Sequence, residues 1–209
     1  MKLRSIALVL AVTLASAAAY AQTGVYVTMD SQQFTQEGVL VTPGTHGNID
    51  RPWLFGPAYG VYFDVTRLPH ILVLPGGPLK TGPVLIGIDG RGDTLRLSLY
   101  GQSFNRQDGI IDLRISTKKT FKGTTPYIMG GFGIGHTKVY GRTYYSNNLV
   151  YQFGIGADHA IAKHIDWRVV EATAGFLQGY NTGYSPSGAG PNQSNYLVTL
   201  GTGLVFLKR

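Results

Sequence analysis

The segment from Tyr196 to Phe206 alternates strictly between two kinds of side chain. A period of two is typical of a β-strand whose two faces meet different surroundings. One face is apolar with aromatic ends, so it suits either a protein core or lipid. The other face is marked by small glycine and threonine residues, which fit the crowded interior of a barrel better than a charge-rich surface in water. The first face consists of Tyr196, Val198, Leu200, Thr202, Leu204 and Phe206, and the second of Leu197, Thr199, Gly201, Gly203 and Val205.

Seven earlier segments repeat this division, several of them with charged residues on the second face. Apolar side chains outside and charged side chains inside indicate a barrel built for a membrane. We therefore predict an all-β fold, an eight-stranded antiparallel up-and-down transmembrane barrel. The expected strands cover roughly residues 24–34, 58–66, 84–91, 111–116, 127–135, 149–158, 165–176 and 196–206.

The stretches between these strands are predicted as connections. Residues 35–55 and 179–195 are polar and contain glycine and proline, and residues 68–81 contain three prolines, which cannot donate to a strand ladder. Residues 92–108 alternate as well, so the third and fourth strands are expected to extend beyond the membrane as a hairpin. With both barrel ends on the periplasmic side, the connections after the first, third, fifth and seventh strands would face outward and be the longer ones.

The amino terminus has the features of a secretory signal peptide. A short basic region is followed by an apolar stretch over residues 6–14 and a small-x-small cleavage site at residues 19–21. The apolar stretch is too short to span a bilayer, and no later segment has the roughly 18 apolar residues of a transmembrane helix. We expect a signal peptide over residues 1–21 and a single outer-membrane barrel domain over residues 22–209.

Composition points the same way. Charged residues make up only 14% of the chain, well under the ~25% typical of soluble domains. The 13 tyrosines suit a membrane interface, and the 29 glycines let crowded interior walls approach closely. The absence of cysteine excludes a disulfide scaffold. A net charge of +7 favours anionic lipid over nucleic acid, because the basic residues are dispersed and no nucleic-acid motif accompanies them.

Three motifs carry a family resemblance. Residues 126–135 read PYIMGGFGIG, and residues 153–168 contain FGIGAD followed by IDWR. In these motifs the chain resembles the small eight-stranded outer-membrane β-barrels, the OmpA-like transmembrane domain and its relatives. The third motif is similar to the barrel-assembly signal of that family, and its residues are Thr199, Gly201, Leu204 and Phe206.

The resemblance implies a place in the outer membrane of a Gram-negative envelope. The implied partners are outer-membrane lipid and the barrel-assembly machinery, with an unknown ligand at the outer loops and no nucleic acid. One departure concerns Arg168 and Glu171, which are three residues apart, whereas relatives often have the pair two apart. Both side chains can point inward only if the strand contains a bulge.

The inward face is predicted to hold a set of ionisable residues. Such residues could serve catalysis or transport, but an unpaired buried charge would cost several kcal/mol. The interior of an eight-stranded barrel is only wide enough for its own side chains. We therefore predict a salt-bridge network that fills the lumen in place of an open pore. The set is Asp64, Asp89, Arg91, Asp112, Arg114, Asp158, Arg168 and Glu171.

Aromatic residues are expected to form two girdles at the membrane interfaces, about 25 Å apart. The predicted periplasmic girdle contains Trp167 and Phe206, and the predicted outer girdle contains Tyr140, Tyr144, Tyr145, Tyr180 and Tyr196.

The sequence gives little support for a catalytic, metal or cofactor site. None of the five histidines has the spacing of metal ligands. The glycines in residues 131–135 and 154–156 are spaced by two on one strand face, unlike a dinucleotide fingerprint that opens a helix. No G-x-S-x-G nucleophile motif occurs. We predict no cofactor, no metal and no catalytic residue.

Three classes of function remain open. The leading hypothesis is a non-enzymatic outer-membrane barrel with a structural role or a surface-interaction role through its outer loops. The second is a lipid-modifying barrel enzyme, which would need Ser, His and a carboxylate together near the lipid interface. The third is a soluble exported ligand-binding barrel, which would need the apolar face inside and the charged face outside.

Overall fold

The computed structural model describes most of the chain as β-strands and turns; its described ranges are residues 23–34, 53–68, 71–74, 77–80, 84–99, 102–117, 122–140, 144–183 and 194–208. The predicted signal peptide lies outside these ranges. Within them, no helix is long and apolar enough to cross a membrane. The strands are β1 Thr23–Phe34, β2 Trp53–Leu68, β3 Ile71–Leu74, β4 Gly77–Lys80, β5 Val84–Leu99, β6 Gln102–Thr117, β7 Thr124–Tyr140, β8 Tyr144–Ala162, β9 Ile165–Gly183 and β10 Ser194–Lys208.

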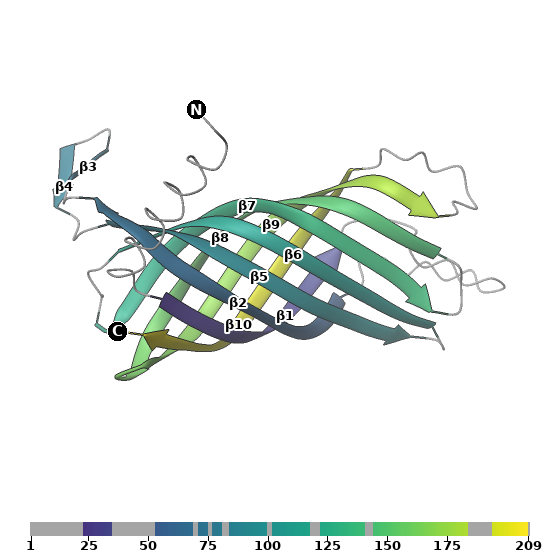
Figure 1. Ribbon diagram of the computed structural model, residues 1–209, viewed down its shortest axis with the longest axis horizontal. Helices are drawn as coiled ribbons and strands as arrows, with labels where there is room; N and C mark the ends of the chain where they lie inside the picture. The colour runs from purple at the N-terminus through teal and green to yellow at the C-terminus, as the bar shows by residue number, and fades with distance from the viewer. Residues whose placement is uncertain are drawn as a thin grey trace, which may run out of the picture.

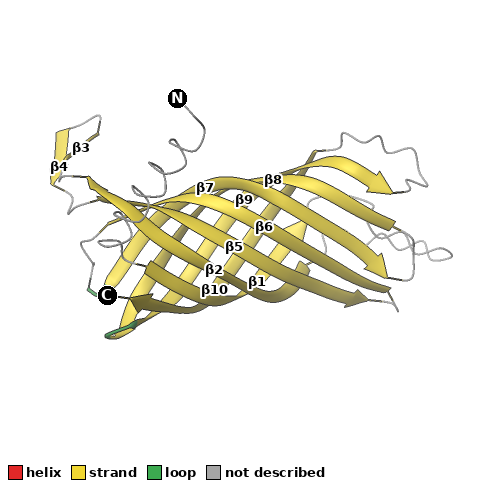
Figure 2. Ribbon diagram, viewed as in Figure 1, coloured by secondary structure: helices red, strands yellow, loops and turns green. Residues whose placement is uncertain are grey.

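Eight of these strands close into one barrel in the order β1-β10-β9-β8-β7-β6-β5-β2, and β1 pairs with β2 to complete the ring (Figure 1). Every pairing in the ring is antiparallel. Figure 2 shows strands along the whole length of the barrel wall. The predicted eight-stranded antiparallel barrel is confirmed. We call the end that carries Thr23 and Lys208 the terminal end, and the opposite end the far end.

The two faces of the strands separate as the alternation predicts. Along β10, Leu197, Thr199 and Val205 are buried, while Leu200 and Phe206 are exposed. The same alternation in β1 exposes Val25, Val27 and Met29 and buries Tyr26, Thr28 and Asp30. The charged face therefore lines the lumen and the apolar face forms the outer wall.

The observed strands are longer than predicted. β2 begins at Trp53, inside the stretch predicted as a connection, and β9 continues to Gly183 past its expected end. β5 and β6 form the predicted extended hairpin, because Leu99 and Gln102 are separated by two residues. The expectation of a long connection after the third strand is therefore wrong.

The predicted connection over residues 68–81 contains a hairpin of its own. β3 and β4 pair antiparallel, and Pro78 stands opposite Val73 within this small sheet. The hairpin lies at the terminal end of the barrel (Figure 1). A second difference is Val84, expected to face outward but only 7% exposed. Val84 is the first residue of β5, and inward and outward side chains alternate regularly from Leu85 to Arg96.

Two apolar layers cross the lumen. Near the terminal end, Tyr26, Tyr62, Val205 and Leu207 form one buried cluster. Nearer the far end, buried side chains of β6, β8, β9 and β10 form a second cluster, made of Ile110, Val150, Leu177 and Leu197. The arginines of the lumen lie between these layers and beyond the second one, whereas Asp64 and Asp166 lie near the terminal end.

Candidate functional site

The lumen holds every carboxylate of the described strands and four of their arginines. Every Asp and Glu in the described ranges is buried, whereas several lysines are exposed. The buried set contains nine carboxylates and four guanidinium groups, namely Asp30, Asp64, Asp89, Asp93, Asp108, Asp112, Asp158, Asp166, Glu171, Arg91, Arg106, Arg114 and Arg168. Burying charges costs several kcal/mol per ion unless they are paired and hydrogen-bonded, so their contacts decide what the site can do.

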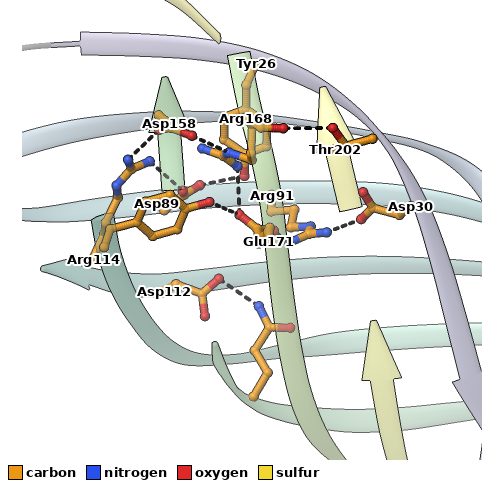
Figure 3. Close-up of polar contacts among 12 residues, drawn as sticks. Tyr26, Asp30, Asp89, Arg91, Asp112, Arg114, Asp158, Arg168, Glu171 and Thr202 are labelled. Atoms are coloured by element: carbon orange, nitrogen blue, oxygen red, sulfur yellow. Dashed lines mark hydrogen bonds and ion pairs between the residues drawn. The ribbon is translucent and has the colours of Figure 1, made fainter. Parts of the chain in front are cut away.

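Glu171 lies at the centre of the network (Figure 3). Arg91 Nη1 donates to its Oε1, and Arg168 Nη1 donates to its Oε2 at 2.8 Å. The Tyr127 hydroxyl also donates to Oε2, at 2.6 Å. The second nitrogen of Arg91 donates to Asp30, so that guanidinium joins two carboxylates.

Asp158 forms a second centre on the same side of the lumen. Its Oδ2 accepts from Arg114 Nη2 at 2.7 Å, and its Oδ1 accepts from Arg168 Nε at 3.1 Å. Arg114 Nη1 lies 3.9 Å from Asp89 Oδ2, and the Tyr26 hydroxyl donates to Asp89 Oδ1 at 2.7 Å. Arg168 thus links the two centres into one network that reaches from β1 to β9.

Tyrosine rings cover the guanidinium groups. Arg114 Cζ lies 4.0 Å from the Tyr62 ring centre and 3.9 Å from the Tyr127 ring centre. Arg168 Cζ lies 4.1 Å from the ring centre of Tyr26. Cations at such distances are attracted by the ring quadrupole. A glycine makes room for a ring: a Cβ added at Gly156 would lie 2.7 Å from Tyr127 Cε2.

A smaller charged group lies nearer the far end, beyond the second apolar layer. Arg106 Nε donates to Asp108 Oδ2 at 2.8 Å, and Arg106 Nη1 donates to Thr137 Oγ1 at 3.2 Å. Asp93 stands opposite Asp108 in the β5–β6 pairing, and its Oδ1 accepts the Asp108 backbone N–H at 3.2 Å. With nine carboxylates and four guanidinium groups among the described residues, the lumen is more acidic than basic.

The structure brings most of the predicted lumen set together. Six of its members share the main network, namely Asp89, Arg91, Arg114, Asp158, Arg168 and Glu171. Asp112 accepts from Gln152 Nε2 at 2.8 Å, and Asp64 is buried in β2 near the terminal end.

Sequence reasoning missed several lumen residues. Asp30, Asp93, Arg106 and Asp108 take part, and each continues the phase of an inward face. Arg106 and Asp108 occupy even positions of β6, as Asp112 and Arg114 do. Continuing that alternation toward the start of the strand predicts that both face the lumen.

The described members of the two predicted aromatic girdles lie at opposite ends of the barrel. Trp167 and Phe206 are 44% and 46% exposed near the terminal end, and Tyr196 is 64% exposed near the far end. Trp167 Nε1 donates to Thr202 Oγ1 at 3.1 Å. In the assembly motif, Thr199 and Gly201 face the lumen and Leu204 faces out. The side chains of Tyr140, Tyr144, Tyr145 and Tyr180 lie outside the described part of the structure.

The described residues do not assemble a metal site: no group of three or more potential metal-binding side chains occurs among them. His136 Nδ1 bonds Asn147 Oδ1 at 2.7 Å, and His159 Nδ1 bonds Thr124 Oγ1 at 2.9 Å. Neither contact is to a serine or a carboxylate. In the described residues the buried charges neutralise one another. The guanidinium groups are bound by carboxylates and stacked against tyrosine rings.

Comparisons with known proteins place the fold. No family model matches the chain, and no curated protein sequence matches it. Among solved structures, the chain is similar to Neisserial surface protein A, with a TM-score of 0.53 and 10% identity over 88% of this chain and 96% of that one. The attachment invasion locus protein Ail of Yersinia pestis matches at a TM-score of 0.48 and 10% identity, over 89% of this chain and 99% of that one.

A third solved structure is the outer membrane protease OmpT from Escherichia coli, at a TM-score of 0.40 and 8% identity, over 90% of this chain and 96% of that one. The resemblance to small eight-stranded outer-membrane barrels is confirmed at the level of the fold. Fold by itself does not assign an activity.

Proposed function

We propose that this protein is a non-enzymatic integral barrel of the bacterial outer membrane, with a closed lumen and a structural or surface-interaction role through the connections at its far end. The observation that carries the proposal is the inside-out distribution of its side chains. Its partners would then be outer-membrane lipid, the barrel-assembly machinery and a ligand at the far end. The terminal end would face the periplasm.

The outer wall supports a membrane position. Phe132, Ile111 and Phe153 are 65%, 59% and 59% exposed, and they lie on neighbouring strands. Monomeric soluble proteins rarely expose contiguous apolar patches larger than a few hundred Å². A soluble ligand-binding barrel would need these side chains inside, so the orientation of the apolar face argues against that alternative.

The contents of the lumen support a closed barrel. Arg168 and Glu171 are 0% and 2% exposed, and Leu177 in the layer above them is 2% exposed. Side chains from opposite walls meet across the lumen, as in the bond between Arg91 of β5 and Glu171 of β9. Eight-stranded barrels are in general filled by their own side chains.

The arrangement gives no support to a lipid-modifying enzyme. Such an activity needs a nucleophile, a base and a carboxylate within hydrogen-bond reach. In the described ranges the carboxylates are buried inside the lumen, whereas His159 contacts Thr124 and His136 contacts Asn147. We therefore propose a structural role or a surface-interaction role.

Three measurements test the proposal. Cell membranes washed with alkaline carbonate should retain the protein, and unheated samples should migrate differently from heated ones on a gel. Release into the soluble fraction would refute the membrane position. Purified protein in planar bilayers should show no large, stable conductance. Nanosiemens-scale openings would refute the closed lumen while leaving the membrane position intact.

A further inference from the structure

Two exposed lysines lie close together at the terminal end of the barrel. Lys163 belongs to the two-residue turn between β8 and β9, and Lys208 is the last residue of β10 (Figure 2). The Leu207 backbone N–H donates to the His164 carbonyl at 2.9 Å, so this turn is bonded to the end of β10. Each lysine is one residue from that hydrogen bond, and their Cα atoms are therefore at most about 13 Å apart.

Neither lysine meets a carboxylate of the described residues. Every Asp and Glu in the described ranges is buried, and the ion pairs of the lumen join these carboxylates to arginines. Two cations held close together repel each other. An anion supplied from outside the protein relieves that repulsion, so electrostatics at this rim favours an anionic partner.

The outer wall next to the two lysines is apolar and aromatic. Phe206 lies two residues from Lys208 on the same face of β10, and its register partner in β9 is Ile165. The next outward-facing pair along these strands is Trp167 with Leu204. The side chains of Phe206, Trp167 and Leu204 are all exposed. A molecule that contacts both the lysines and this wall needs an anionic head beside an apolar tail.

We propose that this rim binds one anionic phospholipid, with its phosphate at Lys163 and Lys208 and an acyl chain along Phe206 and Trp167. The inference rests on the proposed membrane position, and it adds the class of lipid and the face of the barrel that holds it. An anionic polymer in water would use the lysines but leave the apolar wall uncovered. A zwitterionic lipid brings a cation of its own to the site and binds more weakly. Each basic residue near a membrane surface adds roughly fivefold to the affinity for anionic lipid.

Trp167 can report on this site, because it lies where the acyl chain is proposed to bind. The chain has one other tryptophan, Trp53, so the variant W53F leaves Trp167 as the single fluorophore of its kind. The folded W53F barrel is reconstituted in phosphatidylcholine vesicles that contain an increasing share of lipid with brominated acyl chains. The brominated lipid is either phosphatidylglycerol or phosphatidylcholine, and bromine quenches indole fluorescence on contact. Brominated phosphatidylglycerol should quench Trp167 at a lipid share at least about fivefold lower than brominated phosphatidylcholine.

Two further variants in the W53F background test the lysines. K163Q/K208Q should bring the two brominated lipids within about twofold of each other. The charge-matched control R96Q/K138Q removes two exposed cations near the far end and should keep the preference for phosphatidylglycerol.

Loss of the preference in both double variants would overturn the lipid site, as would equal quenching by the two lipids in W53F itself. Quenching by brominated phosphatidylcholine shows in every variant that the barrel is inserted, so these outcomes leave the membrane position intact. If neither brominated lipid quenches Trp167 and heating does not change the gel mobility, the membrane position itself is refuted.

Discussion

Arg168 and Glu171 are three residues apart in β9, yet both side chains point into the lumen and Arg168 Nη1 donates to Glu171 Oε2 at 2.8 Å. Val169 and Val170 between them are both exposed on the outer wall. The pairing with β10 shifts here, so that two residues of β9 stand opposite Thr202 alone. The Thr202 hydroxyl donates to the Arg168 carbonyl at 2.8 Å, which satisfies a backbone group that the bulge removes from the ladder.

Deleting Val169 should leave a barrel that folds. The deletion removes the extra residue and restores a regular ladder, and the two charged side chains then stand two apart on the same face. Deleting Ala174, in a regular part of β9, should instead move every later side chain of that strand to the other face. Gel mobility before and after heating measures both variants. If the two deletions fold equally well, the bulge is not what keeps Arg168 and Glu171 inside.

Glu171→Gln should destabilise the barrel strongly. Glu171 accepts from Arg91 and Arg168, and removing one partner of a buried ion pair costs about 3–5 kcal/mol. The matched control is Asp112→Asn, which makes the same change of carboxylate to amide. Asp112 is bonded to neutral Gln152, so that variant should be neutral or stabilising. Urea unfolding in lipid vesicles measures both, and a similar loss in the two variants would contradict the central role of Glu171.

Leu200→Arg should fold poorly in lipid. Leu200 is 43% exposed on the outer wall, and a basic residue near the bilayer midplane costs about 2–4 kcal/mol in such barrels. Thr199→Ser, on the lumen side of the same strand, should be mild because serine keeps the hydroxyl that accepts from Gln32 Nε2. Folding yield in liposomes, read from gel mobility, separates the two variants.

Leu200→Ala distinguishes lipid from a protein core around the wall. In a fixed core the truncation would open a cavity and cost about 2–5 kcal/mol. Fluid lipid leaves no fixed cavity, so the loss in unfolding free energy should be much smaller. A loss at the upper end of the core range would show that this face packs against protein.

Gly131→Val should destabilise the barrel, whereas Gly109→Val should not. A Cβ at Gly131 would lie 2.6 Å from the Cα of Asp112 inside the barrel, but one at Gly109 would enter open space outside. Overpacking a filled interior typically costs about 1–3 kcal/mol. Unfolding midpoints in urea compare the two variants. Equal stability would mean that the lumen has spare room, and the closed-lumen proposal would need revision.

Much of the fold could be predicted because alternation directly reports which face of a strand a residue occupies. The eight strands and the inward face of Asp112 and Arg114 followed from it. Strand ends were predicted less well, as at Trp53 and Gly183. Beyond the apolar wall, polar residues such as Gln107 occupy both faces of a strand, so the contrast that marks a strand in the sequence disappears.

The sequence by itself determined an inside-out barrel with acidic and arginine side chains in its lumen, because a period of two separates one wall of a strand from the other. It could not determine which charges pair. Arg91 binds Asp30 and Glu171, which are 61 and 80 residues away in the chain. Only the closure of the ring, with its register and the shift at Val169, sets the height of each side chain in the lumen. Two lumen side chains can pair only if they lie at the same height along the barrel axis, and the alternation of a strand's residues carries no information about that height.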